Sequence, residues 1–164
     1  ISSTDTMSWT CTDTGFAATN GTTGNETILV NVASGQTLTI NVAAGATTPT
    51  IKNDGTGAVS VVAGQVTLNV LVKDITTNLA IQNARVYVTA AAGGALAEGT
   101  VIINKVLTDS SGVATDTRAY SGNQPISGRV RYASGSPYYK TAQIAGTINS
   151  ASGLDLTIQM IRDE

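Results

Sequence analysis

The sequence predicts an all-β fold, and three observations support this prediction. Short apolar runs alternate with polar residues at a period of two, which is the periodicity of a half-buried strand. Clusters of Gly, Asn, Asp and Ser separate these runs at short intervals, as turns do. Charged residues make up only 12% of the 164-residue chain, and no window shows apolar spacing of a helix sustained over three turns.

The clearest stretch covers residues 66–88 and reads as strand, polar turn and strand. The first run places four apolar residues on one face: Val66, Leu68, Val70 and Val72. A polar turn begins at Asp74, where the side chains can accept backbone hydrogen bonds. The second run places three more apolar residues on one face: Ala84, Val86 and Val88. Two strands with one buried face each are therefore expected here.

The same pattern extends over residues 64–164 and predicts a seven-stranded β-sandwich. The expected strands lie near residues 66–73, 84–90, 100–107, 112–119, 126–132, 140–148 and 154–161. The last of them has the most regular alternation, with Leu154, Leu156, Ile158 and Met160 on one face. This segment is predicted to form one domain.

Residues 1–63 are predicted to form a smaller strand layer that anchors or oligomerises the chain. Apolar residues share a face near Ile28 and again near Leu38, with a turn at Gly35 between them. Either a hairpin meander or a short stack of solenoid rungs fits this spacing. The polar segment 1–24 contains Trp9 and Phe16, the only Trp and the only Phe. These two rings either contact a neighbouring subunit or cap the local core.

Composition argues against several functions. The net charge is −2, the pI is near 4.9 and no basic patch is evident, so nucleic acid is not an expected partner. No apolar run approaches the length of a membrane span. Histidine is absent and Cys11 is the single cysteine, which removes the Ser-His-Asp arrangement and multi-cysteine metal sites. We therefore expect no enzyme activity, no cofactor and no metal.

Three acidic residues near strand ends have two interpretations. Asp74, Asp109 and Asp116 could hold Ca²⁺ if they met at one edge of a sheet. Their spacing matches no EF-hand loop, and Asp at the start of a turn commonly accepts backbone hydrogen bonds instead. The second interpretation is favoured.

Aromatic and cationic residues at the end of the expected strand 126–132, and in the loop after it, form a candidate contact surface. Tyr132, Tyr138 and Tyr139, together with Arg129 and Arg131, could make an exposed patch that contacts a partner protein or a glycan. Alternatively, the tyrosines cover the open end of the sandwich and the arginines lie on its solvent face. The sequence favours neither interpretation.

Residues 72–86, Val-Lys-Asp-Ile-Thr-Thr-Asn-Leu-Ala-Ile-Gln-Asn-Ala-Arg-Val, resemble the carboxypeptidase regulatory-like family, which has a transthyretin-like, Ig-like sandwich. Residues 108–114, Thr-Asp-Ser-Ser-Gly-Val-Ala, resemble the second motif of that family. The chain departs from the pattern at three positions. Asn78 and Asn83 stand where Gly is usual or common, and Ala80 stands where Pro is usual. Asn tolerates a left-handed backbone, so the turn is expected to persist.

Residues 48–164 also resemble a protein that recurs in tailed phages, marine ones in particular. Four segments carry this resemblance: residues 48–57, 96–103, 135–141 and 153–156. It implies a non-enzymatic virion structural protein, such as a capsid decoration, a head fibre or a tail-associated module. Such a protein would lie on the virion surface or outside the cell, and it would contact capsid or other virion proteins.

Three functions are consistent with these observations. The first is a virion structural protein that forms a homo-oligomer, for example a trimer, through residues 1–63 and displays the Ig-like domain. The second is a carbohydrate-binding or adhesive module that contacts a host surface glycan. The third is a subunit of an extracellular filament in which residues 1–24 are donated to a neighbour by donor-strand exchange.

Overall fold

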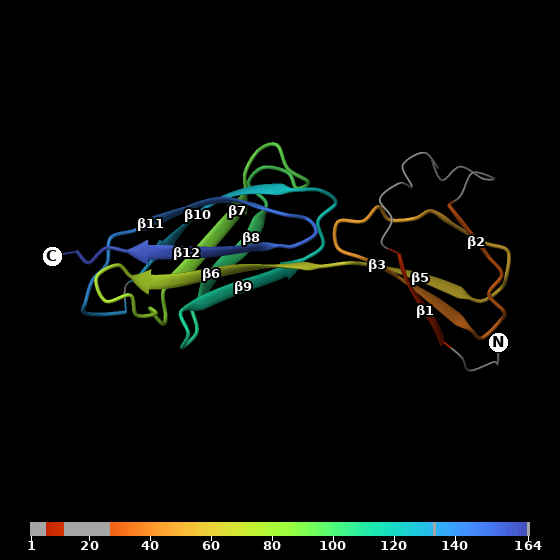
Figure 1. Ribbon diagram of the computed structural model, residues 1–164, viewed down its shortest axis with the longest axis horizontal. Coiled ribbons are helices and arrows are strands. Elements are labelled where there is room, and N and C mark those ends of the chain that lie inside the picture. The colour runs from red at the N-terminus through yellow and green to blue at the C-terminus, as the bar shows by residue number, and fades with distance from the viewer. Residues whose placement is uncertain (1–5, 12–26, 133, 164) are drawn as a thin grey trace. The chain divides into compact units, whose positions relative to one another are not determined.

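The structure is a computed structural model, and it describes residues 6–11, 27–132 and 134–163 (Figure 1). The described part is all-β, with twelve strands and no helix. The chain divides into two compact units, Ile1–Gln65 and Val66–Glu164.

The N-terminal unit consists of two small parallel sheets. One sheet has the order β1-β3-β5, formed by β1 (Thr6–Cys11), β3 (Thr37–Val42) and β5 (Ala58–Ala63). The other pairs β2 (Ile28–Val30) with β4 (Ile51–Asn53). Every pairing in both sheets is parallel. Consecutive strands alternate between the sheets, so the chain winds in successive rungs.

This winding selects the solenoid arrangement over the hairpin meander. Strands joined by a tight hairpin run antiparallel, whereas parallel strands need a crossover connection. Here the crossover between two strands of one sheet is made by a strand of the other sheet. β1 belongs to the segment 1–24, and it pairs with β3 of its own chain.

Close backbone contacts hold successive rungs together at one corner. The Asn53 side-chain oxygen accepts hydrogen bonds from the backbone N–H groups of Val32 at 3.1 Å and Gly55 at 3.0 Å. Its side-chain nitrogen donates to the Gly57 carbonyl at 2.9 Å. A Cβ atom at Gly55 would lie 2.1 Å from the Val32 carbonyl oxygen, so only glycine fits there. The Asn53-Asp54-Gly55 segment therefore joins two rungs and makes no hairpin.

The core of the N-terminal unit is small. Its described buried aliphatic residues are Val32, Ile40 and Val42. By contrast, β5 is exposed along most of its length, and Val61 and Val62 remain 39% and 48% accessible. β5, one of the two edge strands of the β1-β3-β5 sheet, thus has exposed valine side chains.

The C-terminal unit has two sheets. The four-stranded sheet has the order β11-β10-β7-β8 and the three-stranded sheet has the order β12-β6-β9. All pairings are antiparallel except that of β6 with β12, which is parallel. Their bounds are β6 (Val66–Asp74), β7 (Arg85–Ala90), β8 (Val101–Leu107), β9 (Val113–Arg118), β10 (Gln124–Arg131), β11 (Ala142–Ile148) and β12 (Leu154–Met160). Each strand expected in residues 64–164 coincides with one of these to within two residues.

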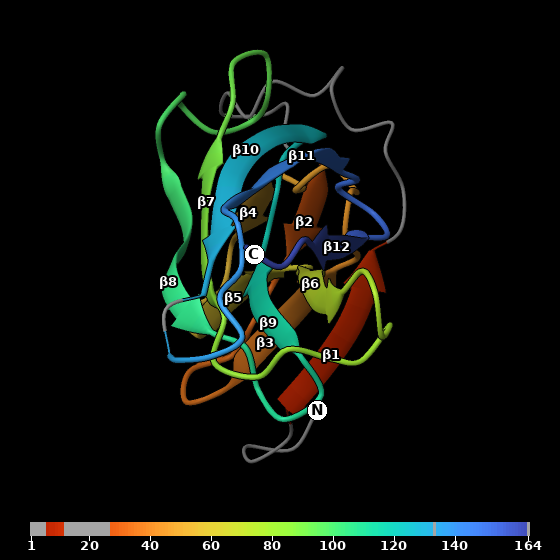
Figure 2. The same ribbon diagram turned by 90° about the vertical axis from the view of Figure 1, so that its left-hand side faces the viewer.

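The two sheets form two layers around a shared core (Figure 2). The buried residues of β6 are those with even numbers, as the period-two pattern predicts. Aliphatic residues of the other sheet are buried as well, including Val86, Val88, Val130 and Ile144. Edge strands also touch between the layers, β11 against β12 and β8 against β9. One face of each sheet is thereby buried and the other remains open.

The turn between β6 and β7 contains two asparagines in the left-handed conformation. Asn78 has φ +56° and Asn83 has φ +63°, both in the left-handed region. Asn adopts this region more easily than most residues with a Cβ atom. The expectation that the turn persists with Asn at these positions is confirmed.

Candidate functional site

A groove of about 670 Å³ lies on the open face of the four-stranded sheet. Residues of β7, β8 and β10 line it, together with Asn83 before β7 and four residues between β10 and β11: Tyr132, Ser134, Tyr139 and Thr141. The described lining contains four cationic side chains and no acidic one. These four are Arg85, Lys105, Arg129 and Arg131.

Strand register places these cations side by side. Arg131 of β10 lies directly opposite Arg85 of β7, and Arg129 lies opposite Tyr87. The Arg129 guanidinium carbon is 5.7 Å from the centre of the Tyr87 ring, which is a cation–π contact. Like charges directly opposite each other across two strands are destabilising. The sheet therefore carries an electrostatic cost at the Arg85–Arg131 pair.

A β-bulge in β8 brings the fourth cation to this face. Val86 pairs with Val106 and Val88 pairs with Ile103, so two residues of β8 stand opposite Tyr87 alone. One of them, Lys105, has φ +56°. Strict alternation from the buried Ile103 would direct Lys105 into the core. The extra residue reverses the alternation and puts Lys105 on the groove face, which is a common effect of bulges.

The groove cations lack carboxylate partners among the described residues. The described residues form four ion pairs, none of which includes a groove cation: Lys52–Asp54, Arg118–Asp116, Lys140–Asp163 and Arg162–Asp74. The nine Lys and Arg residues of the chain leave five outside these pairs. Four of the five line the groove, and the fifth is Lys73. Four of the nine Lys and Arg residues thus share one face, and none of the four has a carboxylate partner among the described residues.

The three tyrosines expected near this site take different positions. Tyr132 and Tyr139 both line the groove, and their rings meet edge to face with centroids 5.4 Å apart. Tyr138 is 61% exposed and does not line it. The sequence pattern groups all three tyrosines with Arg129 and Arg131, whereas the structure adds Arg85, Tyr87 and Lys105 to the groove. Arg85 and Tyr87 alternate with the buried valines of β7, and this alternation places both of them on the open face of the sheet.

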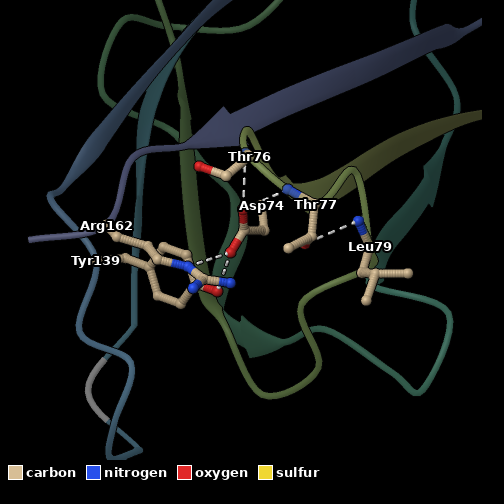
Figure 3. A network of polar contacts seen from close by, with 6 residues as sticks. All are labelled: Asp74, Thr76, Thr77, Leu79, Tyr139 and Arg162. Atoms are coloured by element: carbon tan, nitrogen blue, oxygen red, sulfur yellow. Dashed lines mark hydrogen bonds and ion pairs between the residues drawn. The ribbon is translucent and has the colours of Figure 1, made fainter.

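A buried carboxylate fixes the Tyr139 side of the groove (Figure 3). The Asp74 side chain, only 3% exposed, accepts hydrogen bonds from the backbone N–H groups of Thr76 at 2.7 Å and Thr77 at 3.0 Å. Its other oxygen accepts from the Tyr139 hydroxyl at 2.8 Å and from Arg162 Nε at 2.7 Å. One residue therefore ties the β6–β7 turn to the segment before β11 and to the C-terminal end.

These contacts shift the pKa values of the residues involved. The Thr77 backbone hydrogen bond, with those from Tyr139, Arg162 and Thr76, holds the Asp74 pKa well below its usual range against the opposing effect of burial. Burial, and then the hydrogen bond to Asp74, raises the pKa of Tyr139. Asp74 is therefore a charged structural anchor that holds the Tyr139 hydroxyl in place.

The other candidate residues have local roles or lie outside the described part. The Asp109 carboxylate accepts backbone hydrogen bonds from Ser111 at 2.8 Å and Val113 at 2.9 Å, as the turn interpretation predicts. Within the described ranges, no three His, Cys, Asp or Glu side chains are grouped so that they could hold a metal ion. Trp9 lies in β1, where it pairs with Ile40, and Phe16 is outside the described residues. The described residues include no helix that is long and apolar enough to cross a membrane.

Comparison with known proteins found no match for this chain among family models, curated proteins or solved structures.

Proposed function

We propose that this chain is a non-enzymatic virion structural protein that assembles through its N-terminal unit and displays an Ig-like sandwich. A capsid decoration, a head fibre and a tail-associated module all fit this description. The observation that carries the proposal is the exposed strand β5 at the edge of a short parallel stack. The resemblance of residues 48–164 to a tailed-phage protein supports the virion context.

The N-terminal unit has the features of a surface made for assembly. A parallel stack buries its core between successive rungs, so a stack with few rungs leaves apolar surface at its ends. The sheet order β1-β3-β5 puts β5 at an edge, and Val61 and Val62 of that strand are exposed. Exposed apolar edge strands readily add a further strand from another chain. A second copy or a capsid protein would cover this edge.

The C-terminal unit has the features expected of the displayed domain. Two layered sheets, a turn with left-handed Asn78 and Asn83, and the parallel pairing of β6 with β12 are compatible with an Ig-like, transthyretin-like sandwich. The groove on its open face also favours the second function, an adhesive module. A displayed domain and an adhesive domain are compatible, because a virion protein can present a binding surface to the host.

The assembly proposal is tested by the mass of the full chain in solution, measured by light scattering at two concentrations. We expect a closed oligomer, such as a trimer. Val61→Lys adds a charge to the β5 edge and should shift the oligomer to monomers. Val101→Lys is the matched control, since Val101 is also 39% exposed but lies in β8 of the other unit. A monomeric wild-type chain, or an oligomer that Val61→Lys leaves intact, would contradict assembly through β5.

A further inference from the structure

We propose that the groove on the four-stranded sheet binds an acidic oligosaccharide, one whose sugar rings carry carboxylate or sulfate groups. This inference concerns the C-terminal unit alone and does not depend on how the N-terminal unit assembles. Charge, backbone geometry, aromatic lining and size each contribute to it.

The charge of the groove calls for an anionic partner. Arg85, Lys105, Arg129 and Arg131 share one face and no acidic side chain lines the groove in the described part. Arginine donates paired hydrogen bonds that match the geometry of carboxylate and sulfate groups. A ligand with several such groups along its length would meet several cations at once. Its negative charge would also remove the repulsion between Arg85 and Arg131.

The backbone supports a binding role because it maintains this charge at a cost. Lys105 adopts a left-handed conformation that residues with a Cβ atom rarely occupy. The bulge that contains it places Lys105 beside the arginines. Opposing arginines add an unfavourable interaction in the same place. Violations of local rules are most often found at functional sites.

The aromatic lining favours a sugar among the anionic ligands. Tyr87, Tyr132 and Tyr139 all line the groove among the cations. The apolar C–H face of a sugar ring packs well on an aromatic ring, whose face carries partial negative charge. Tyr139 is held by its hydrogen bond to Asp74, and its ring packs against Tyr132. A ring fixed in this way loses little entropy when a ligand binds.

Size and overall charge argue against nucleic acid as the ligand. A volume of about 670 Å³ is in the range of small-ligand sites, which accommodates roughly two to three sugar rings. Nucleic-acid binding usually depends on a long basic stripe and a basic domain. This chain has a net charge of −2, and the groove cations form one compact group. A short acidic glycan fits this arrangement better.

The test measures binding of the full chain by titration calorimetry to four probes. These are an oligogalacturonate, a heparin-derived oligosaccharide, a neutral maltooligosaccharide of similar length and a single-stranded oligonucleotide of similar charge. We expect at least one acidic oligosaccharide to bind, with an affinity that falls as salt rises. The neutral sugar should not bind, and the oligonucleotide should bind at least tenfold more weakly. The two acidic probes distinguish recognition of carboxylate from recognition of sulfate.

Variants link the binding to the groove. The double substitution of Arg85→Gln with Arg131→Gln should weaken binding about a hundredfold, roughly tenfold for each charge-assisted contact removed. Lys105→Gln should weaken it about tenfold and provides a second variant if the first folds poorly. Lys73→Gln is the matched control, because Lys73 also lacks a carboxylate partner among the described residues but does not line the groove. It should bind as the wild type does.

Three outcomes would overturn the proposal. The first is the absence of binding to both acidic probes at low salt. The second is binding of the oligonucleotide as tight as that of the acidic sugars, which would indicate a general polyanion surface. The third is equal loss of binding in Lys73→Gln and Lys105→Gln, which would show that net charge matters and the groove does not.

Discussion

Thr108 provides a stringent test of how the C-terminal unit is held together. Thr108 directly follows β8 in the sequence, and its side chain is almost completely buried. The hydroxyl accepts a hydrogen bond from the Ala84 backbone N–H at 2.9 Å and donates one to the Ile81 carbonyl at 2.6 Å. Thr108→Val keeps the shape of the side chain and removes both hydrogen bonds. The Ala84 N–H and the Ile81 carbonyl are then left without the Thr108 hydroxyl as a partner.

The expected loss can be worked out from these contacts. Each buried group left unsatisfied costs about 1–3 kcal/mol, so the two together cost about 2–6 kcal/mol. The added methyl group returns about 0.8 kcal/mol. The net loss of about 1–5 kcal/mol should lower the urea midpoint by about 0.5–2.5 M, given a slope of about 2 kcal/mol per molar.

The assay can report on each unit separately. All five tyrosines lie in the C-terminal unit and the one tryptophan, Trp9, lies in the N-terminal unit. Tyrosine near-UV circular dichroism should therefore follow the effect of Thr108→Val, with tryptophan fluorescence as a reference. Thr89→Val is the matched control, since the Thr89 hydroxyl bonds Ser127 at an exposed position. A Thr108→Val midpoint equal to that of wild type would refute the reasoning.

Three further predictions concern the Asp74 anchor, the rungs of the N-terminal unit and the groove. Asp74→Asn should destabilise the protein at neutral pH. Because the folded-state pKa of Asp74 is lowered, this contribution is complete above the unfolded pKa of about 4 and shrinks as pH falls below it, which urea unfolding at several pH values would show. Asn53→Ala removes three rung contacts and should lower the midpoint of the tryptophan-detected transition by about 1 M. Arg131→Gln should raise the free energy of unfolding by about 0.5 kcal/mol at low salt, because it relieves the repulsion with Arg85. This gain should fade at high salt. An unchanged free energy of unfolding in salt titrations would argue against that repulsion.

The period-two pattern predicted the strands of the C-terminal unit because burial there depends on alternation alone. In β6 each even-numbered residue is buried, and in β7 Val86 and Val88 are buried as expected. Turn chemistry was similarly readable: Asp74 and Asp109 both accept backbone hydrogen bonds within their own turns. These features are local, so a single sequence contains enough information to predict them.

The sequence does not determine whether the strands of the N-terminal unit pair in parallel or antiparallel. Asn53-Asp54-Gly55 is a strong turn signal that fits a hairpin or a solenoid corner; in the structure Asn53 bonds Val32 on the previous rung and Gly55 packs against the Val32 backbone. A turn toward an antiparallel neighbour and a corner of a parallel rung use the same small and amide residues. The choice between them depends on contacts some twenty residues away, which no local pattern encodes.

The groove shows why part of a site can be invisible in a sequence that otherwise reads clearly. Arg129 and Arg131 stand out because they alternate with the buried Val130, and Arg85 and Tyr87 follow the same rule. Lys105 does not, because alternation from Ile103 predicts a buried position that a lysine could not occupy without a partner. The bulge resolves this conflict by adding one residue, and it moves the charge to the side where the arginines lie. A lysine at a position that alternation assigns to the core therefore indicates an irregularity in the strand, such as the bulge found here.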